Sequence, residues 1–197
     1  MTNNDKQNWQ VLFATILLTA GISVLWLVST PMTDDDIRMP TRHTAQLAFA
    51  LYIVILVARP LQQLLRKDWT ATLLRKRRLI GVAFAAVMTT HLGLIAYRFG
   101  TQPELEYPLF NLMFGGTAYA LFYLMLITSF DAPKKALGPK KWKLLHRTGL
   151  VWAALIFGLP RSLDELTDPE YLKFGIPFVI ALLIRFTAWQ RLRQRGS

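Results

Sequence analysis

The stretch QNWQVLFATILLTAGISVLWLVSTPMT, residues 7–33, contains no charged side chain. A helix crosses the hydrocarbon core of a bilayer with about 20 mainly apolar residues. The stretch is long enough for this, and we predict a membrane-spanning helix at residues 9–29. It is too long for the core of a signal peptide and lacks a basic leader, so we expect the helix to be retained.

Five more apolar stretches follow, separated by charged segments. The last two carry basic residues near their ends, whose long side chains can reach the headgroup layer. Because backbone polar groups in lipid must be satisfied within each segment, we predict an all-α polytopic membrane protein, a single six-helix bundle over residues 1–197. The cationic segment 59–78 is expected to be an anchoring loop rather than an interfacial helix. The further predicted spans are residues 43–58, 79–98, 108–130, 144–162 and 172–190.

The composition agrees with this class. The chain is 53% hydrophobic and only 18% charged, yet its formal net charge is +11; a typical soluble domain is roughly 25% charged. This combination excludes a disordered chain, a coiled coil and most cytosolic enzymes. The absence of cysteine excludes a disulfide framework, an iron–sulfur cluster and a thiolate zinc site.

The loop charges predict the orientation. With the N-terminus inside, 18 of the 23 cations and only 3 of the 12 acids fall on the inner face. This positive-inside bias predicts that both termini are cytoplasmic. Because topology explains the basic loops, we do not take them as an indication of nucleic-acid binding. The inner cations lie in residues 6, 59–78, 134–147 and 185–195.

Few chemistries are available within the predicted spans. None of them contains Asp or Glu, which argues against an ion-coupled transporter. There is no HExxH, GxSxG or Gly-rich phosphate motif, which argues against intramembrane proteolysis and nucleotide chemistry. A channel or transporter for small molecules is disfavoured by the lack of polar pairs in mid-membrane.

Three histidines remain. His91 lies 13 residues past Arg78, about 20 Å of helix rise from the inner boundary. A neutral imidazole is the usual axial ligand of haem between membrane helices, because it supplies a nitrogen without a buried charge. A lone histidine at this depth either binds haem or bonds to a neighbouring helix. His146 lies near the inner boundary, where a headgroup contact is the simpler interpretation, and His43 is placed like a helix-start residue.

Two segments carry a resemblance to a known family. RKRRLIGVAFAAVMTTHLGLIAYRFG (75–100) and LGPKKWKLLHRTGLVWAAL (137–155) resemble the third and fifth helices of MsrQ-type proteins, and residues 41–60 fit the second. These are haem-binding membrane subunits of the bacterial methionine-sulfoxide reductase system, in the ferric-reductase-like transmembrane superfamily. The resemblance implies six spans and electron transfer through b-type haem.

The resemblance also implies site residues. His91 and His146 match two haem-associated histidines and are the implied metal ligands. The family usually carries another histidine about thirteen residues further on, where this chain has Leu159. Three arrangements stay open: a five-coordinate haem on His91, a shift in depth that lets His146 reach the same iron, or a second nitrogen from His43, which lies within about 4 Å of His91 in depth.

Other residues fit a haem site but have simpler explanations. Arg98 lies on the same helical face as His91 and would either pair with a haem propionate or extend to the membrane boundary. Glycines at 115, 116, 149 and 158 would admit a flat ring, or more commonly another helix.

The sequence thus predicts a haem b protein of the bacterial inner membrane that carries electrons to an outer-face acceptor. It would be an electron-transfer subunit rather than a complete enzyme. The donor would be a cytoplasmic flavoprotein reductase with its own flavin, or a membrane quinone. The acceptor would be a periplasmic oxidoreductase, docking where DDD (34–36) and DELTDPE (164–170) concentrate negative charge. The alternative is a haem-free member that acts as a scaffold or assembly subunit.

Overall fold

The computed structural model describes residues 2–31, 33–102, 109–158 and 169–196. All regular secondary structure in these ranges is helical, which confirms the all-α prediction. The helices are α1 (Asn3–Ser29), α2 (Asp34–Leu65), α3 (Asp68–Thr101), α4 (Leu109–Ile127), α5 (Asp131–Leu137), α6 (Pro139–Gly158) and α7 (Pro169–Gly196).

The cationic segment 59–78 is not the loop that the sequence predicted. Helix α2 continues to Leu65 and α3 begins at Asp68, so that only two residues separate them. Arg66 takes a left-handed conformation with φ 51°, and its N–H bonds to the Gln62 carbonyl at 3.2 Å. The prediction was wrong because arginine, lysine and leucine are good helix formers. Charge marks where a helix leaves the lipid, not where it ends.

Four of the described helices are long and apolar enough to cross a membrane, namely α1, α2, α3 and α7. A fifth span results if α4 and α5 are taken together, but the chain bends by 107° between them. The fourth predicted span ran to residue 130, whereas α4 ends at Ile127 and the cationic sequence DAPKKAL forms the separate helix α5. The structure therefore supports a multi-pass protein, and six spans stays a prediction.

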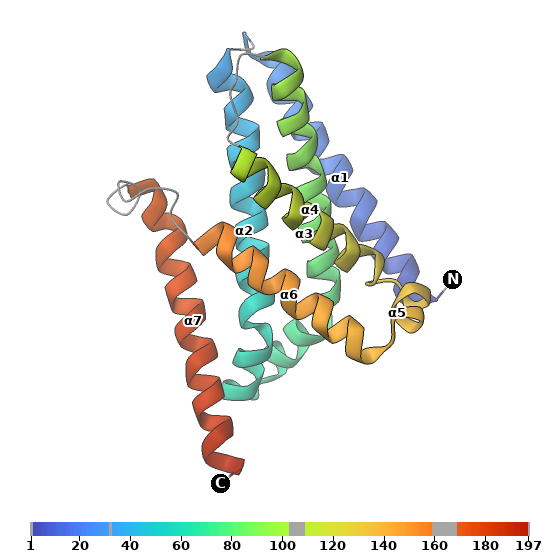
Figure 1. Ribbon diagram of the computed structural model, residues 1–197, viewed down its shortest axis with the longest axis vertical. Helices are drawn as coiled ribbons and strands as arrows, with labels where there is room; N and C mark the ends of the chain where they lie inside the picture. The colour runs from blue at the N-terminus through green and yellow to red at the C-terminus, as the bar shows by residue number, and fades with distance from the viewer. Residues whose placement is uncertain (1, 32, 103–108, 159–168, 197) are drawn as a thin grey trace.

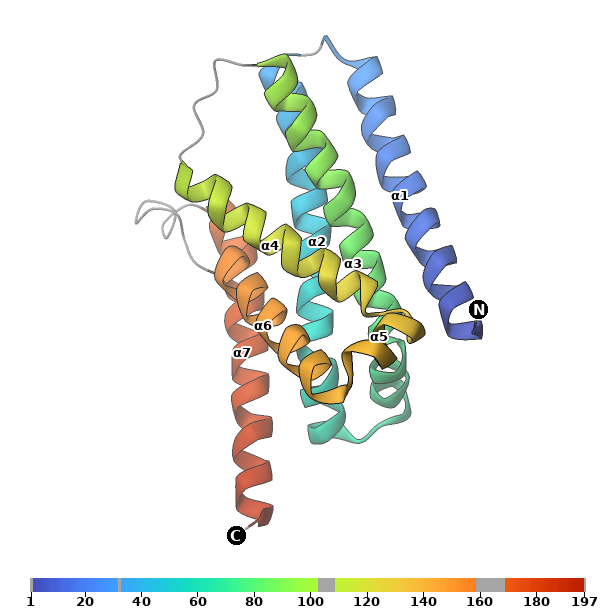
Figure 2. The same ribbon diagram turned by 45° about the vertical axis from the view of Figure 1, so that its right-hand side comes forward.

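Helices α2 and α3 form the centre of the bundle and pack along their length (Figure 1). Helix α1 flanks α3, α7 flanks α2, and the paired helices α4 and α6 run obliquely across the bundle (Figure 2). The core lies where these layers meet and includes Tyr52, Phe84, Val87 and Phe122. In Figure 1 the α2–α3 turn and the C-terminus lie in the lower part of the picture, and the N-terminus is at the lower end of α1. We call this end of the helices the basic end.

Two prolines inside α2 create contacts with neighbouring helices. Proline has no N–H, so the carbonyl four residues earlier loses its helical partner. For Pro60 this carbonyl belongs to Leu56, and Arg185 of α7 donates to it at 3.3 Å. For Pro40 the freed carbonyl accepts a hydrogen bond from the indole of Trp26 of α1 at 3.2 Å. The prolines thus join α2 to the helices on both sides.

Acidic residues at the basic end have structural roles. Arg78 of α3 lies 3.4 Å from Asp5 of α1 and 3.1 Å from Asp131 of α5. The Thr2 hydroxyl donates to Asp131 at 2.7 Å. This hydrogen bond, and then the charge of Arg78, hold the pKa of the Asp131 carboxyl below its ordinary value. Asp68 lies in the first turn of α3, where the helix dipole favours a negative charge.

Candidate functional site

A buried hydroxyl of α2 contacts the His91 imidazole. Its Nδ1 lies 2.9 Å from Oγ1 of Thr44, a buried residue. The same Oγ1 is 2.9 Å from the carbonyl oxygens of Pro40 and Thr41. Because carbonyl oxygens can only accept, we infer that the hydroxyl proton is directed to them and that His91 Nδ1–H donates to Thr44. In a neutral imidazole this leaves the lone pair on Nε2, the form that ligates a metal.

The packing around His91 also fixes its position along the bundle. Thr90, the preceding residue, is buried, and its hydroxyl lies 2.8 Å from that of Thr19 on α1. Leu94, three residues after His91, packs with Leu27 of α1 and Ile37 of α2. The imidazole is itself half-buried. These contacts from two helices restrict sliding of α3, so the imidazole is held at a defined depth.

His43 lies one residue before Thr44 and therefore near the depth of His91, as the sequence predicted. Its side chain is exposed, whereas that of Thr44 is buried against α3. Consecutive helix residues point about 100° apart, so both cannot face the same neighbour. A second nitrogen from His43 would require α2 to rotate, and this role stays a prediction.

His146 lies elsewhere, where α4 ends and α6 begins. Its Nε2 is 3.3 Å from the hydroxyl of Thr128, and its ring centroid is 4.2 Å from that of Trp142. The Trp142 indole donates to the Thr128 carbonyl at 3.0 Å. Asp131, three residues after Thr128, pairs with Arg78 at the basic end. The described contacts do not bring His146 and His91 together.

Arg98 lies in the last turn of α3, seven residues beyond His91. Its Nε donates to the side-chain oxygen of Gln102 at 3.4 Å. Leu159, at the position where the resemblance implies a histidine, lies outside the described residues, as do residues 164–168 of the acidic segment. In the other acidic segment, Asp36 forms a capping box with Thr33 and so helps to begin α2.

The four glycines divide into two groups. A Cβ on Gly149 would overlap the Met125 side chain of α4, and one on Gly158 would overlap the Phe178 ring of α7. These two glycines therefore serve close helix packing. A Cβ on Gly115 or Gly116 would meet nothing within 4 Å. This leaves an open stretch on α4.

The donor set fits haem better than it fits a metal ion held by protein alone. Within the described residues, no group of three or more His, Cys, Asp or Glu side chains is placed to hold a metal ion. A metal ion held by protein alone needs about four ligands, whereas a porphyrin supplies four nitrogens itself and requires only one or two axial ligands. A neutral imidazole whose other nitrogen is hydrogen-bonded meets that requirement.

Sequence reasoning missed Thr44 and Thr128 as partners of the histidines. Both are threonines in or just after a helix, and both bond to carbonyls in the preceding turn. The available signal in the sequence was a threonine that lies on a neighbouring helix at the same depth as a buried histidine. The pairing itself depends on helix rotation, which apolar length does not reveal.

The chain was compared with known proteins. A family model described as ferric reductase like transmembrane component matches residues 44–159. MsrQ of Herminiimonas arsenicoxydans, the haem-binding subunit of protein-methionine-sulfoxide reductase, is 27% identical over 95% of this chain and 88% of that protein. MsrQ of Azospira oryzae is 28% identical over 94% and 80%. The magnetosome protein MamZ of Paramagnetospirillum magneticum is 27% identical over 92% of this chain but 29% of its own length. No solved structure matches.

Proposed function

Because the chain belongs to the ferric-reductase-like transmembrane family, we propose that it is a membrane electron-transfer subunit that binds b-type haem through Nε2 of His91. The observation that carries this proposal is the hydrogen bond between His91 Nδ1 and the buried Thr44 hydroxyl. The two relatives named as haem-binding subunits, each matched over most of this chain, support the cofactor.

The residues around His91 would prepare the ligand. Thr44 would orient the imidazole and keep its one N–H proton on Nδ1, which places the lone pair on Nε2. The contact between Thr19 and Thr90 holds the helix at its depth. Haem iron supplies a centre that takes up and releases one electron. Arg98, further along α3, would bind a propionate.

We further propose that His146 would ligate a separate haem near the basic end. Thr128 would orient this imidazole as Thr44 orients His91, because its hydroxyl also lies near a helix carbonyl, at 2.7 Å from Leu124. Thirteen residues of α3 separate Arg78 from His91, a rise of about 20 Å. A single iron shared by the two histidines would need a large shift of α6.

The proposed direction of transfer follows the predicted topology. With the basic end cytoplasmic in a bacterial inner membrane, a flavoprotein reductase or a membrane quinone would deliver electrons there. A periplasmic oxidoreductase would receive them at the opposite face. Two relatives are named as subunits of a methionine-sulfoxide reductase, and a similar partner is proposed for this chain.

The absorbance of the purified protein tests the proposed function. Protein from haem-replete cells is expected to show a b-type α band in a dithionite-reduced minus oxidised spectrum. Pyridine haemochrome quantification is expected to give at least one haem per chain. If His146 holds its own haem, the value should be near two, and His146→Ala should reduce it to about one. A colourless protein would overturn the proposal and favour the haem-free scaffold.

Removing the Thr44 hydroxyl is expected to weaken haem binding while the ligand stays in place. Thr44→Val keeps the shape but leaves His91 Nδ1 without its acceptor, and loss of such a partner typically costs about 10–100-fold in metal affinity. Haem titration of the apoprotein measures this, with the midpoint potential as a second readout. Thr41→Val is the matched control, because the Thr41 hydroxyl bonds to the Ile37 carbonyl. Thr44→Ser should restore binding; wild-type affinity in Thr44→Val would contradict the positioning role.

A further inference from the structure

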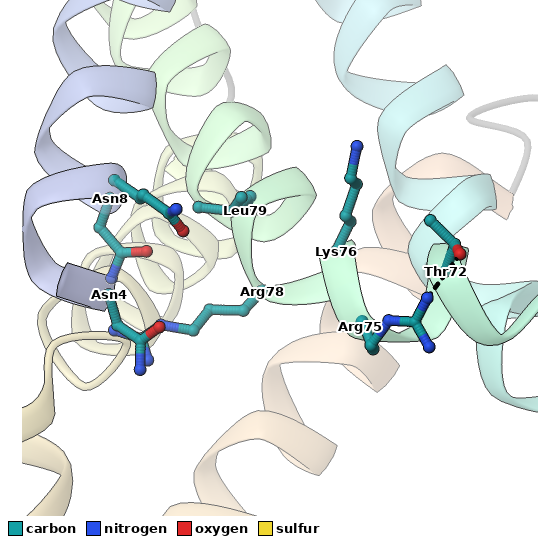
Figure 3. A pocket seen from close by; sticks show the side chains of 8 residues that line it. Asn4, Asn8, Thr72, Arg75, Lys76, Arg78 and Leu79 are labelled. Carbon is teal, nitrogen blue, oxygen red and sulfur yellow. Dashed lines mark hydrogen bonds between the residues drawn. The ribbon is translucent and has the colours of Figure 1, made fainter.

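A cavity of about 370 Å³, lined mainly by residues with polar or basic side chains, opens between α1 and α3 at the basic end. Its walls include Asn4 and Asn8 from α1 and Arg75, Lys76 and Arg78 from α3. Figure 3 shows the two asparagines on one side and Arg78 extending toward them from α3. None of the lining residues is acidic. The cavity therefore concentrates hydrogen-bonding groups with positive charge.

The basic side chains that line the cavity differ in whether a carboxylate pairs with them. Arg78 pairs with Asp5 and Asp131. Arg75 and Lys76 are exposed, and no carboxylate among the described residues forms an ion pair with either. Arg75 instead donates to the hydroxyl of Thr72 at 2.7 Å (Figure 3). Two charges next to the cavity are thus available to an anion.

Asn8 adds a second feature. Its side chain is fully buried, and its Nδ2 donates to the Ser129 carbonyl at 3.0 Å. Its Oδ1 has no hydrogen-bond partner among the described residues. A buried amide oxygen without a partner costs free energy. A group that carries a hydroxyl and enters the cavity would be placed to reduce this cost.

An apolar groove of about 650 Å³ adjoins the cavity. It runs over α2 and α3 and is lined by side chains that include Val54, Leu61, Trp69 and Ile80. The groove and the cavity share three lining residues, among them Lys76. The apolar groove is therefore continuous with the positively charged cavity. The combined site is apolar on the side of the bilayer interior and cationic at the end.

We propose that this combined site binds an anionic phospholipid with a hydroxylated headgroup, such as phosphatidylglycerol. One acyl chain would lie in the groove, and the phosphate would be held by Arg75 and Lys76. Basic sites between membrane helices on the cytoplasmic side are suited to anionic headgroups. The uncharged headgroup of a quinone would leave both cations without a counter-charge. This proposal does not depend on haem.

Native mass spectrometry from nanodiscs of mixed phosphatidylglycerol and phosphatidylcholine tests the site. The wild type is expected to retain phosphatidylglycerol selectively. The double variant Arg75→Gln, Lys76→Gln should retain about tenfold less, from the loss of two charges near the phosphate. The matched control is Lys140→Gln, Lys141→Gln, which removes two exposed cations of α6 and should retain the lipid. Equal loss in both pairs, or no preference in the wild type, would overturn the proposal.

Two further measurements separate a lipid from other occupants. Ala83 lines the groove, and Ala83→Trp would fill it without changing charge. This variant should lose phosphatidylglycerol while melting at a temperature close to that of the wild type. Displacement of the lipid by inorganic phosphate would instead indicate a headgroup site without a chain. That result, or extraction of a quinone in place of phospholipid, would overturn the proposal.

Discussion

Replacing His91 by alanine is expected to remove the reducible b-type spectrum from the purified protein. The imidazole is the proposed axial nitrogen, and its Nδ1 is already engaged by Thr44. A methyl group offers iron no donor, so the haem content of that site should fall to about the level of non-specific binding. If His146 holds a separate haem, as proposed, one haem per chain should remain. Pyridine haemochrome quantification of His91→Ala, alone and with His146→Ala, measures both effects.

His43→Ala is the matched control for His91→Ala. The two histidines lie at similar depth on adjacent helices, but the His43 side chain is exposed. The control is expected to keep the wild-type spectrum, because Thr44 rather than His43 faces α3. Loss of haem in His43→Ala would show that α2 rotates to supply the second ligand. Full retention of haem in His91→Ala, with His146 also replaced, would remove the basis of the proposed function.

A large side chain at Gly149 is expected to separate α4 from α6. Gly149 is buried, and even a Cβ there would overlap the Met125 side chain. A methyl group can be accommodated by movement of the flexible methionine, but leucine adds more atoms than that movement can clear. Overpacking of this kind costs typically about 1–3 kcal/mol. We expect Gly149→Leu to destabilise the protein by this amount, measured by unfolding in mixed detergent micelles.

Gly116→Leu provides the comparison for this effect. The substitution is chemically identical and lies on the paired helix α4, where a Cβ would meet nothing within 4 Å. Its effect on the free energy of unfolding should stay within about 0.5 kcal/mol, as for other open surface sites. Equal destabilisation by the two substitutions would show that the α4–α6 contact is not as close as the structure has it. If both variants are stable but only Gly116→Leu loses haem, the open stretch of α4 faces the cofactor.

The apolar blocks were sufficient to locate helices but not their ends. A helix was predicted to stop near Arg59 and another to begin after Arg78, because charges leave the hydrocarbon there. Both helices continue into the basic end, since leaving lipid does not break helical hydrogen bonds. The bend before α5 was not predicted either. It follows from Thr128–Phe130, where the chain leaves α4, and from a new helix start at Asp131.

The site was predictable in depth but not in rotation. Counting residues along the helix placed His91 deep in the bundle and His43 near its level. It did not show that Thr44, rather than His43, faces α3, because one residue along a helix changes direction by about 100°. Helix rotation is set by packing between side chains of different helices, such as Leu94 and Leu27. The spacing of residues along one sequence does not show which side chains will pack together.

The charges at the basic end show the same limit. The sequence predicted a face rich in cations, with three acids among them. It did not predict that two of these acids, Asp5 and Asp131, would meet on Arg78 from separate helices. These ion pairs join residues 73 and 53 positions apart, and they depend on how α1, α3 and α5 converge. Only the structure provides that arrangement.

The position of iron tests the central claim most directly. An experimental structure of the haem-loaded protein, with iron located by its anomalous scattering, would place the metal relative to each histidine. We expect iron at coordination distance from Nε2 of His91, with Nδ1 still bonded to Thr44. An imidazole at position 91 surrounded only by protein side chains, with iron elsewhere or absent, would contradict the proposed function.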